Sequence, residues 1–414
     1  MKIIPIYTWN KGVLNFNRKS DNLSKKPWFQ GVLLLCCVIV AMLLANLPFT
    51  KQLYHDVLET SFQIHLSSPD GRINLLFPRD MTVEKFINDI LMVVFFFTVG
   101  LEIKREIKYG ELSSTKKAML PVIAAAGGMA MPAIIFTVFN HGTAAASGWG
   151  IPTATDIAFA VGILSFLGNK VPVSLKVFLT ALAIADDLGA ILVVAFFYGG
   201  AINIPLLAIS LLIIAITFIL NQLGEKRMIY YLIPAIAVWF LFYYAGIHAT
   251  MSGVVMAMMI PMEPRYSRAY LLRRGHEYDR RLESYDNYEA TDGEAFPNEI
   301  QRHCLRRMTH INNNAMGMSY RLEHALTPWV NFGIMPIFAL ANAGVEIPDL
   351  SYFNIFQYSP AIGSVGMGIF FGLLIGKPLG ITLASWLAIK LKVGAMPKNS
   401  TWKMLFAVAC LGGI

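Results

Sequence analysis

The sequence predicts an all-α polytopic membrane protein, and three observations lead to this fold class. Of its 414 residues, 56% are hydrophobic and only 14% are charged, whereas a soluble domain carries about 25% charged residues. The mean hydropathy is +0.54. Apolar runs that are long enough to cross a bilayer recur along the chain, and such runs are typical of spanning helices.

The basic residues are distributed as in a membrane protein rather than in a nucleic-acid-binding protein. The chain holds 34 Lys and Arg against 26 Asp and Glu, but these basic residues are spread over the loops between the apolar runs. With the N-terminus in the cytoplasm, the inside segments hold 29 of the 34 basic residues. Because a cytoplasmic excess of Lys and Arg sets membrane orientation, we expect a cytoplasmic N-terminus and no nucleic-acid partner.

Ten full spans and the start of an eleventh are expected. The first follows a polar, basic tail, so it should remain as an anchor rather than be cleaved as a signal. The expected spans are 28–47, 86–103, 118–139, 149–168, 172–199, 203–221, 228–244, 246–262, 326–344 and 362–389, with an eleventh from about 402. The resulting parts are a cytoplasmic tail (1–27), spans one to eight (28–262, including an outside loop at 48–85), a long cytoplasmic loop (263–323) and the remaining spans (324–414).

Two loops have patterns of their own. The outside segment "SFQIHLSSPDGRINLLF" (61–77) alternates on both sides of a Pro-Asp-Gly turn and predicts a β-hairpin, which is either an ordered loop or a dimer contact. The inside segment 263–323 has 10 basic and 10 acidic residues. It predicts a solvated, partly disordered loop with a short helix near 266–285, the alternative being a specific partner site. The cysteines show no disulfide or metal-binding pattern.

The stretch "FLTALAIADDLGAILVVAFFYG" (178–199) places Asp186 and Asp187 side by side in an apolar run. One Asp at a bilayer centre costs about 2.5–3.5 kcal/mol, so a pair requires a cause. Neighbouring helix positions point about 100° apart, and one carboxylate can face a cavity while the other faces a helix. Close, buried carboxylates favour bound protons, and their oxygens suit a small hard cation. The pair therefore predicts a site that exchanges protons for cations.

A second polar interruption lies in "GWGIPTATDIAFAVGI" (148–163). Pro152 removes a backbone donor and the threonines offer local hydrogen bonds. A span broken here would leave unpaired backbone groups, and Asp156 would offset the positive end of a helix. A kinked helix capped by Asp156 is the alternative.

The remaining ionisable residues within spans are Asp89, His248 and Lys377. Lys377 precedes Pro378 near the middle of its span and is too central to reach the interface easily. We expect it to pair with an aspartate or to offset the C-terminal end of a broken helix. The alternative is a buried ion pair that only fixes packing. One lysine cannot, however, neutralise all four aspartates within the spans, which are Asp89, Asp156, Asp186 and Asp187.

Several motifs resemble those of the NhaA-type sodium/proton antiporters: "INDILMVVFFFTVGLEIKRE" (87–106), "TATDIAFA", "ALAIADDLGA", "GIHATMSGV", "FALANAGV" and "GLLIGKPLGI". The similarity runs from about residue 28 to the C-terminus, apart from 263–323. The resemblance implies twelve helices with an inverted repeat, in which two broken helices cross beside the ion site. It also implies pH-regulated, electrogenic exchange of cytoplasmic Na⁺ or Li⁺ for external H⁺ in a bacterial inner membrane, without a cofactor or enzymatic activity.

The resemblance also implies roles for individual residues. The cation-binding pair maps onto Asp186 and Asp187, with Asp89 as a secondary position. The charge-compensating and transport residues map onto Thr155, Asp156 and Lys377, with Lys377 paired to Asp186. The pH-sensing group maps onto Glu102, Arg105, Glu106, His248, Glu323 and His324. The hairpin 61–77 lies where the family forms its homodimer contact.

Three features depart from the family pattern. The loop 263–323 is much longer, and Thr327 replaces a histidine common in the pH-sensing region. The chain also ends at "FAVACLGGI" (406–414), where the family's eleventh helix would unwind, so we expect a truncated sequence.

Two other function classes are weaker matches. An intramembrane aspartyl protease needs its aspartates on different helices and a Gly-x-Gly-Asp motif. A proton-coupled symporter for an organic substrate needs a larger polar or aromatic pocket.

Overall fold

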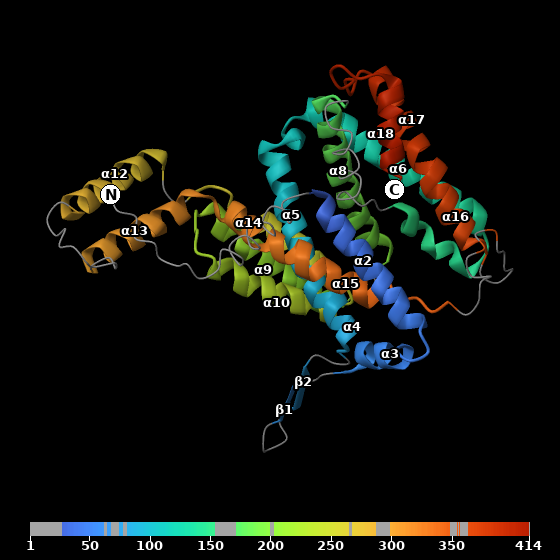
Figure 1. The fold of residues 1–414 in the computed structure, drawn as a ribbon, viewed down its shortest axis with the longest axis horizontal. Helices are drawn as coiled ribbons and strands as arrows, with labels where there is room; N and C mark the ends of the chain where they lie inside the picture. The colour runs from blue at the N-terminus through green and yellow to red at the C-terminus, as the bar shows by residue number, and fades with distance from the viewer. Residues whose placement is uncertain are drawn as a thin grey trace, which may run out of the picture. The chain divides into compact units, whose positions relative to one another are not determined.

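The structure is a computed structural model, drawn in Figure 1. The chain divides into two compact units. It describes residues 27–61, 64–67, 74–77, 81–153, 171–198, 203–264, 267–286, 299–347, 354, 356 and 363–413. Unit 1 comprises Met1–Met92, Glu106–Gly199 and Asn331–Ile414, and unit 2 comprises Val93–Arg105 and Gly200–Val330.

Seven helices among the described residues are long and apolar enough to cross a membrane. They are Phe29–Asn46, Val83–Tyr109, Ala118–Asn140, Ser174–Val194, Ile204–Gln222, Met318–Asn342 and Val365–Lys390. Ile229–Ala245 and Trp402–Leu411 are shorter apolar helices. These helices agree with the expected polytopic architecture, whereas the number of spans and the inverted repeat stay predictions.

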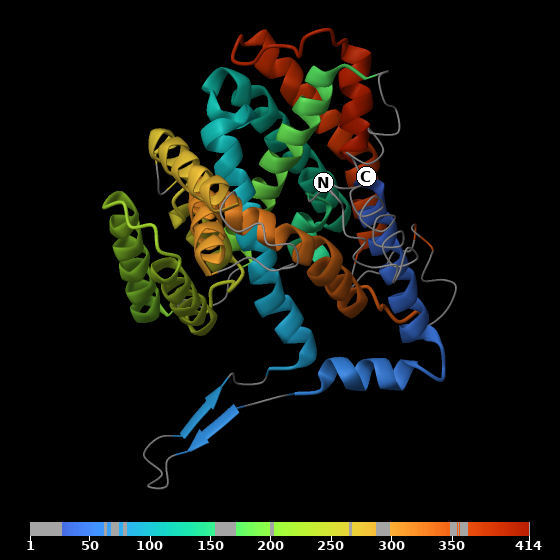
Figure 2. The same cartoon turned by 60° about the vertical axis from the view of Figure 1, so that its left-hand side comes forward.

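Unit 1 is built mainly from apolar helices that pack around α6. Its helices and strands are α2 (Pro27–Asn46), α3 (Lys51–Glu59), β1 (Ile64–Ser67), β2 (Asn74–Phe77), α4 (Val83–Lys85), α6 (Thr115–Asn140), α8 (Val173–Phe197), α15 (Met335–Asn342), α16 (Val365–Phe371), α17 (Lys377–Lys390) and α18 (Trp402–Leu411). Within the segment 61–77, β1 and β2 pair antiparallel, with Ile64 opposite Phe77 (Figure 2). The core joins α6, α8, α17 and α18 through Ala124, Leu179, Ile381 and Leu405.

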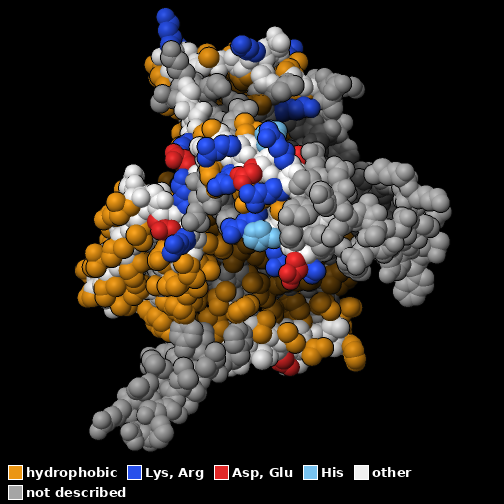
Figure 3. All heavy atoms as spheres, turned by 90° about the vertical axis from the view of Figure 1, so that its left-hand side faces the viewer, with side chains coloured by type: hydrophobic (Ala, Val, Ile, Leu, Met, Phe, Trp, Pro, Cys, Tyr) orange, Lys and Arg blue, Asp and Glu red, His pale blue; other side chains and the backbone are white. Residues whose placement is uncertain are grey.

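Unit 2 contains most of α5 (Met92–Tyr109) together with the helices from α9 to α14. These are α9 (Ile204–Gln222), α10 (Ile229–Ala245), α11 (Met251–Met259), α12 (Arg268–Asp286), α13 (Glu299–Ala315) and α14 (Met318–Trp329). One core cluster joins Leu101, Tyr231, Ala257 and Ile260. The outer faces of α9 and α10 expose many aliphatic side chains, part of the broad hydrophobic area in Figure 3. Such a face suits lipid contact.

Several expected element boundaries differ in the structure. The helix expected from 326 begins at Met318, because Met318 and Leu322 pack against a buried core cluster. The span expected at 246–262 contains only the helix Met251–Met259, since Gly246 ends α10 with a positive φ of 79°. The segment 263–323 holds α12 near the predicted helix, and it also holds α13, which we did not predict.

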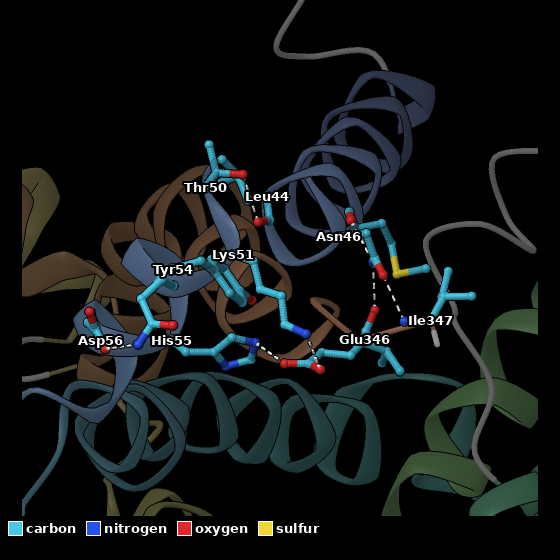
Figure 4. Close-up of polar contacts among 12 residues, drawn as sticks. Leu44, Asn46, Thr50, Lys51, Tyr54, His55, Asp56, Glu346 and Ile347 are labelled. Atoms are coloured by element: carbon cyan, nitrogen blue, oxygen red, sulfur yellow. Dashed lines mark hydrogen bonds and ion pairs between the residues drawn. The ribbon is translucent and has the colours of Figure 1, made fainter. Parts of the chain in front are cut away.

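A hydrogen-bonded strap fastens the start of unit 1 to the segment after α15 (Figure 4). Asn46 Nδ2 donates to the carbonyl of Val345 at 2.8 Å, and the amide of Ile347 donates to Asn46 Oδ1 at 2.7 Å. The Tyr54 hydroxyl donates to the carbonyl of Leu340 at 2.7 Å, near the C-terminal end of α15. The bond from Tyr54 satisfies one of the carbonyls that the end of α15 leaves without a partner inside the helix.

An ionic contact completes the strap. Lys51 Nζ lies 2.7 Å from Glu346 Oε2, and His55 Nε2 lies 2.9 Å from Glu346 Oε1. Figure 4 shows both side chains directed from α3 to this carboxylate. The hydrogen bond from Lys51 lowers the pKa of Glu346 below its ordinary value. The strap therefore fixes α3, from which the chain continues to β1.

Candidate functional site

A buried ion pair between α17 and α8 is the centre of the candidate site. Lys377 Nζ donates to Asp186 Oδ2 at 2.7 Å and to the backbone carbonyl of Thr153 at 2.6 Å. Lys377 and Asp186 are each only 1% exposed. A buried charge requires a partner, and this lysine has a carboxylate and a carbonyl.

Close packing between α6 and α17 brings Lys377 into the interior of unit 1. A Cβ at Gly127 would collide with the carbonyl oxygen of Gly380, and a Cβ at Gly380 would collide with that of Gly127. Small residues allow helices in membranes to approach this closely. Lys377 lies one turn before Gly380, directly after the π-helical turn Gly372–Gly376.

The two aspartates have different surroundings, as the helix geometry predicts. Asp186 is buried, whereas Asp187 on the same helix is partly exposed. The charge of Asp187 also acts on Lys377. One carboxylate is thus held in an ion pair and the next is more accessible.

A small cavity adjoins the ion pair inside unit 1. It is lined by Ala125, Leu179, Leu182, Ala183, Asp186, Lys377, Ile381 and Gly412. Apart from the ion pair, these side chains are apolar, so the lining offers few other groups to bind an ion. The low polarity strengthens electrostatic interactions with the pair.

The carbonyl that binds Lys377 comes from the end of the 3₁₀ helix Ala144–Thr153. The hydroxyl of Thr153 donates to the carbonyl of Gly150 at 2.6 Å. Tyr198, just after α8, accepts from the Gly150 amide at 2.9 Å and donates to the Ser147 carbonyl at 2.7 Å. Tyr198 therefore braces this helix, and sequence reasoning missed both its role and that of the Thr153 carbonyl.

Three other predicted transport residues are placed less fully. Thr155 and Asp156 lie outside the described residues. Asp89 lies in the π-helical turn Phe86–Leu91. Its neighbour Asn88 exchanges two side-chain hydrogen bonds with Asn342, at 3.1 and 2.8 Å.

A second ionic cluster in unit 2 contains predicted pH-sensing residues. Arg105 Nη1 lies 2.5 Å from Glu323 Oε1, and Arg105 Nη2 lies 3.8 Å from Glu102 Oε1. Glu323 is 9% exposed, so its charge is largely removed from solvent. The His324 ring stacks on Tyr320 with 5.8 Å between centroids. The structure therefore joins Glu102, Arg105 and Glu323 in one cluster.

Glu106 and His248 are two further predicted pH-sensing residues. Glu106 belongs to unit 1, and a Cβ at Gly110 would collide with its carboxylate. His248 lies between α10 and α11, where its carbonyl accepts from the Met251 amide. The hydroxyl of Thr327 donates to the carbonyl of Glu323 at 2.7 Å.

Comparison with known proteins gives consistent matches over nearly the whole chain. Residues 21–414 match the family model described as Na⁺/H⁺ antiporter 1. The Na⁺/H⁺ antiporter NhaA of Oleidesulfovibrio alaskensis is 42% identical, over 93% of this chain and 81% of the relative. NhaA of Pelagibacter ubique is 40% identical, over 95% of this chain and 87% of the relative. NhaA of Escherichia coli O139:H28 is 37% identical, over 93% of this chain and 83% of the relative.

Proposed function

The chain belongs to the Na⁺/H⁺ antiporter 1 family, and from this premise we propose that it exports cytoplasmic Na⁺ or Li⁺ in exchange for external protons. We place it in a bacterial inner membrane with a cytoplasmic N-terminus, following the distribution of Lys and Arg. The observation that carries the proposal is the buried Lys377–Asp186 pair next to the more accessible Asp187.

In this proposal Asp187 is the first oxygen ligand that a sodium ion meets. Its carboxylate is partly exposed, whereas Lys377 occupies Oδ2 of Asp186. For Asp186 to bind the ion as well, the lysine must release this oxygen. Lys377 also has the Thr153 carbonyl as a partner, so it can keep one hydrogen bond during the exchange.

Protons act as the competing ligands. When the site opens to the outside, protonation of the carboxylates replaces the charge compensation that sodium supplied, and the ion leaves. When the site faces the cytoplasm, these protons dissociate and sodium binds again. The requirement that buried charges be compensated thus couples the two fluxes without any covalent chemistry.

Other residues have supporting roles in the proposal. Asp156, with Thr155 beside it, offsets the positive end of a broken helix, and Asp89 is a secondary ionisable position. Glu102, Arg105, Glu106, His248, Glu323 and His324 set the pH range of activity. The β1–β2 hairpin forms a homodimer contact.

Sodium-dependent proton flux in everted membrane vesicles tests the function. Respiration acidifies the vesicle interior, and added Na⁺ should dissipate the pH gradient as sodium enters and protons leave. A matched amount of choline chloride is the control for ionic strength. A gradient that does not respond to Na⁺ or Li⁺ at any pH would overturn the proposal, and deepening of the gradient would indicate a symporter.

A further inference from the structure

The helical insertion formed by α12 and α13 is anchored at the end of apolar helices. The Ser319 amide donates to the Pro261 carbonyl at 3.2 Å, which joins the two ends of the insertion. A Cβ at Gly317 would collide with the carbonyl oxygen of Met262, so glycine allows this close approach. Only two residues separate α13 from α14, the first part of the candidate span Met318–Asn342. The insertion is therefore held close to one end of a spanning segment.

Contact between the two helices determines which face of α12 is open. The helices α12 and α13 pack against each other, and Cys304 and Ile311 on α13 are buried. On α12, Arg273, His276 and Arg280 are exposed. With about 100° between successive helix positions, these three side chains share one face.

This face carries a hollow lined by Arg273, His276, Glu277, Arg280 and Arg281. The hollow has one carboxylate, and both of its oxygens are already used. Glu277 Oε2 lies 2.6 Å from Arg274 Nη1, and Glu277 Oε1 lies 2.9 Å from Arg281 Nη2. The hydrogen bond from Arg274 lowers the pKa of Glu277, which keeps this carboxylate ionised and paired.

Two arginines of the hollow, Arg273 and Arg280, are exposed. Within the residues that the structure describes, Arg273 and Arg280 form no ion pair. Figure 3 shows Lys and Arg side chains, with Asp, Glu and His side chains among them, gathered in one area of the surface that it views. Guanidinium groups bind phosphate through paired hydrogen bonds. The chemistry of the hollow therefore favours a phosphate-bearing anion.

An apolar neighbour indicates where that phosphate comes from. Leu272 is 57% exposed and lies one turn before His276 on the helix surface. Basic side chains next to an exposed aliphatic one are typical of helices at a membrane surface, and basic clusters next to a spanning helix attract anionic lipids. We propose that the α12 hollow binds the phosphate of an anionic phospholipid in the cytoplasmic leaflet. This assignment depends on the proposed membrane orientation but not on transport.

Hydrogen exchange of the purified full-length chain in detergent tests the site. Short-chain phosphatidylglycerol is titrated, and the exchange of backbone amides in α12 is measured by mass spectrometry. We expect lipid to slow this exchange, and the variant R273Q/R280Q to raise the half-saturating concentration about 30-fold, from the effect of two basic residues near a surface. The variant R302Q/R306Q removes the same charge from α13. It should change the half-saturating lipid concentration less than fivefold, which corresponds to about 1 kcal/mol or less.

A further variant and a competing anion separate the site from simpler explanations. E277Q removes the one carboxylate of the hollow, so it should tighten lipid binding. In each variant, unchanged exchange of α13 without lipid shows that the insertion is folded. If R273Q/R280Q and R302Q/R306Q weaken lipid binding equally, the effect depends only on overall charge, and the proposed site is overturned. Protection by inorganic phosphate at the same concentration would overturn the lipid assignment. Absence of protection by phosphatidylglycerol would overturn the proposal as a whole.

Discussion

Lys377 Nζ and Asp186 Oδ2 are 2.7 Å apart and buried, although the two residues are 191 positions apart in the chain. The pair joins α17 to α8, and the Thr153 carbonyl adds a third element. The same contact serves two purposes in our proposal. It neutralises charge in a low-dielectric interior, and it holds one carboxylate in reserve for ion exchange.

The first prediction concerns the stability of this pair. Lys377→Ala leaves Asp186 buried without its ammonium, and breaking a buried pair costs about 3–5 kcal/mol. We expect a strongly lowered melting temperature in detergent, measured by intrinsic fluorescence or light scattering. The double variant D186N/K377M removes both charges and should be more stable than K377A. If K377A melts like the wild type and transports normally, the side chain must reach solvent, contrary to the structure.

The second prediction separates the two aspartates. Asp187→Asn removes the accessible carboxylate while leaving the Lys377–Asp186 pair in place. We expect sodium-driven proton flux to disappear with little change in melting temperature. Asp56→Asn, on the exposed helix α3, is the matched control and should transport normally. Normal flux in D187N would show that Asp187 is not the sodium ligand.

The third prediction concerns the pH dependence of transport. Arg105 holds Glu102 and Glu323 in one cluster, and removal of two negative charges lowers the proton affinity of neighbouring groups. In E102Q/E323Q, we expect the pH of half-maximal flux to move downwards. The control E59Q/E84Q removes two carboxylates outside the cluster and should leave the profile unchanged. An unmoved profile in E102Q/E323Q would mean that these residues are ordinary interface charges.

The fourth prediction follows from the strap at α3. The pKa of Glu346 is lowered chiefly by the hydrogen bond from Lys51. Because the pKa is lower in the folded state, this contact stabilises the protein at pH values above the unfolded-state pKa of about 4.3. The stabilisation is lost as the pH falls through the folded-state pKa. The melting temperature of the wild type should therefore exceed that of Glu346→Gln at pH 7, and the difference should vanish in acid.

The control for this prediction is Glu59→Gln, which removes a carboxylate from α3 without removing a partner of Lys51. A constant difference between the wild type and E346Q over the whole acidic range would show that the Glu346 carboxylate stabilises the fold by something other than its charge.

The sequence alone was most informative where the free energy of burying a residue depends only on the local sequence. A charged side chain in an apolar run is unfavourable wherever the run packs, so Asp186, Asp187 and Lys377 could be selected from the sequence. The Lys377–Asp186 pairing itself came from a family resemblance, because charge counting left several aspartates open. The Thr153 carbonyl could not be predicted, since it depends on where a 3₁₀ helix ends.

The insertion shows the opposite difficulty. Ile300, Cys304 and Ile311 have helical spacing, but the many charges of 263–323 favoured a solvated loop. The helix α13 packs against α12, and its Cys304 and Ile311 are buried, but such tertiary burial is not visible in composition. The close contact of Gly127 with Gly380 is similar, because a single glycine gives no indication of the helix that it meets.

The last prediction is that sodium and protons compete for Asp186 and Asp187. Both ligands stabilise the same carboxylates, and the cavity beside the pair is otherwise apolar, so two bare charges would be costly there. The apparent sodium affinity should fall as pH is lowered, and sodium binding should release protons into solution. If two protons leave for each sodium that enters, every cycle moves net charge, and the membrane potential supplies about 2.3 kcal/mol per charge per 100 mV. Current on a solid-supported membrane after a sodium jump, recorded over a range of pH, measures both effects, with D187N as the inactive control. A sodium affinity independent of pH would rule out competition, and intact exchange without current would rule out the unequal stoichiometry.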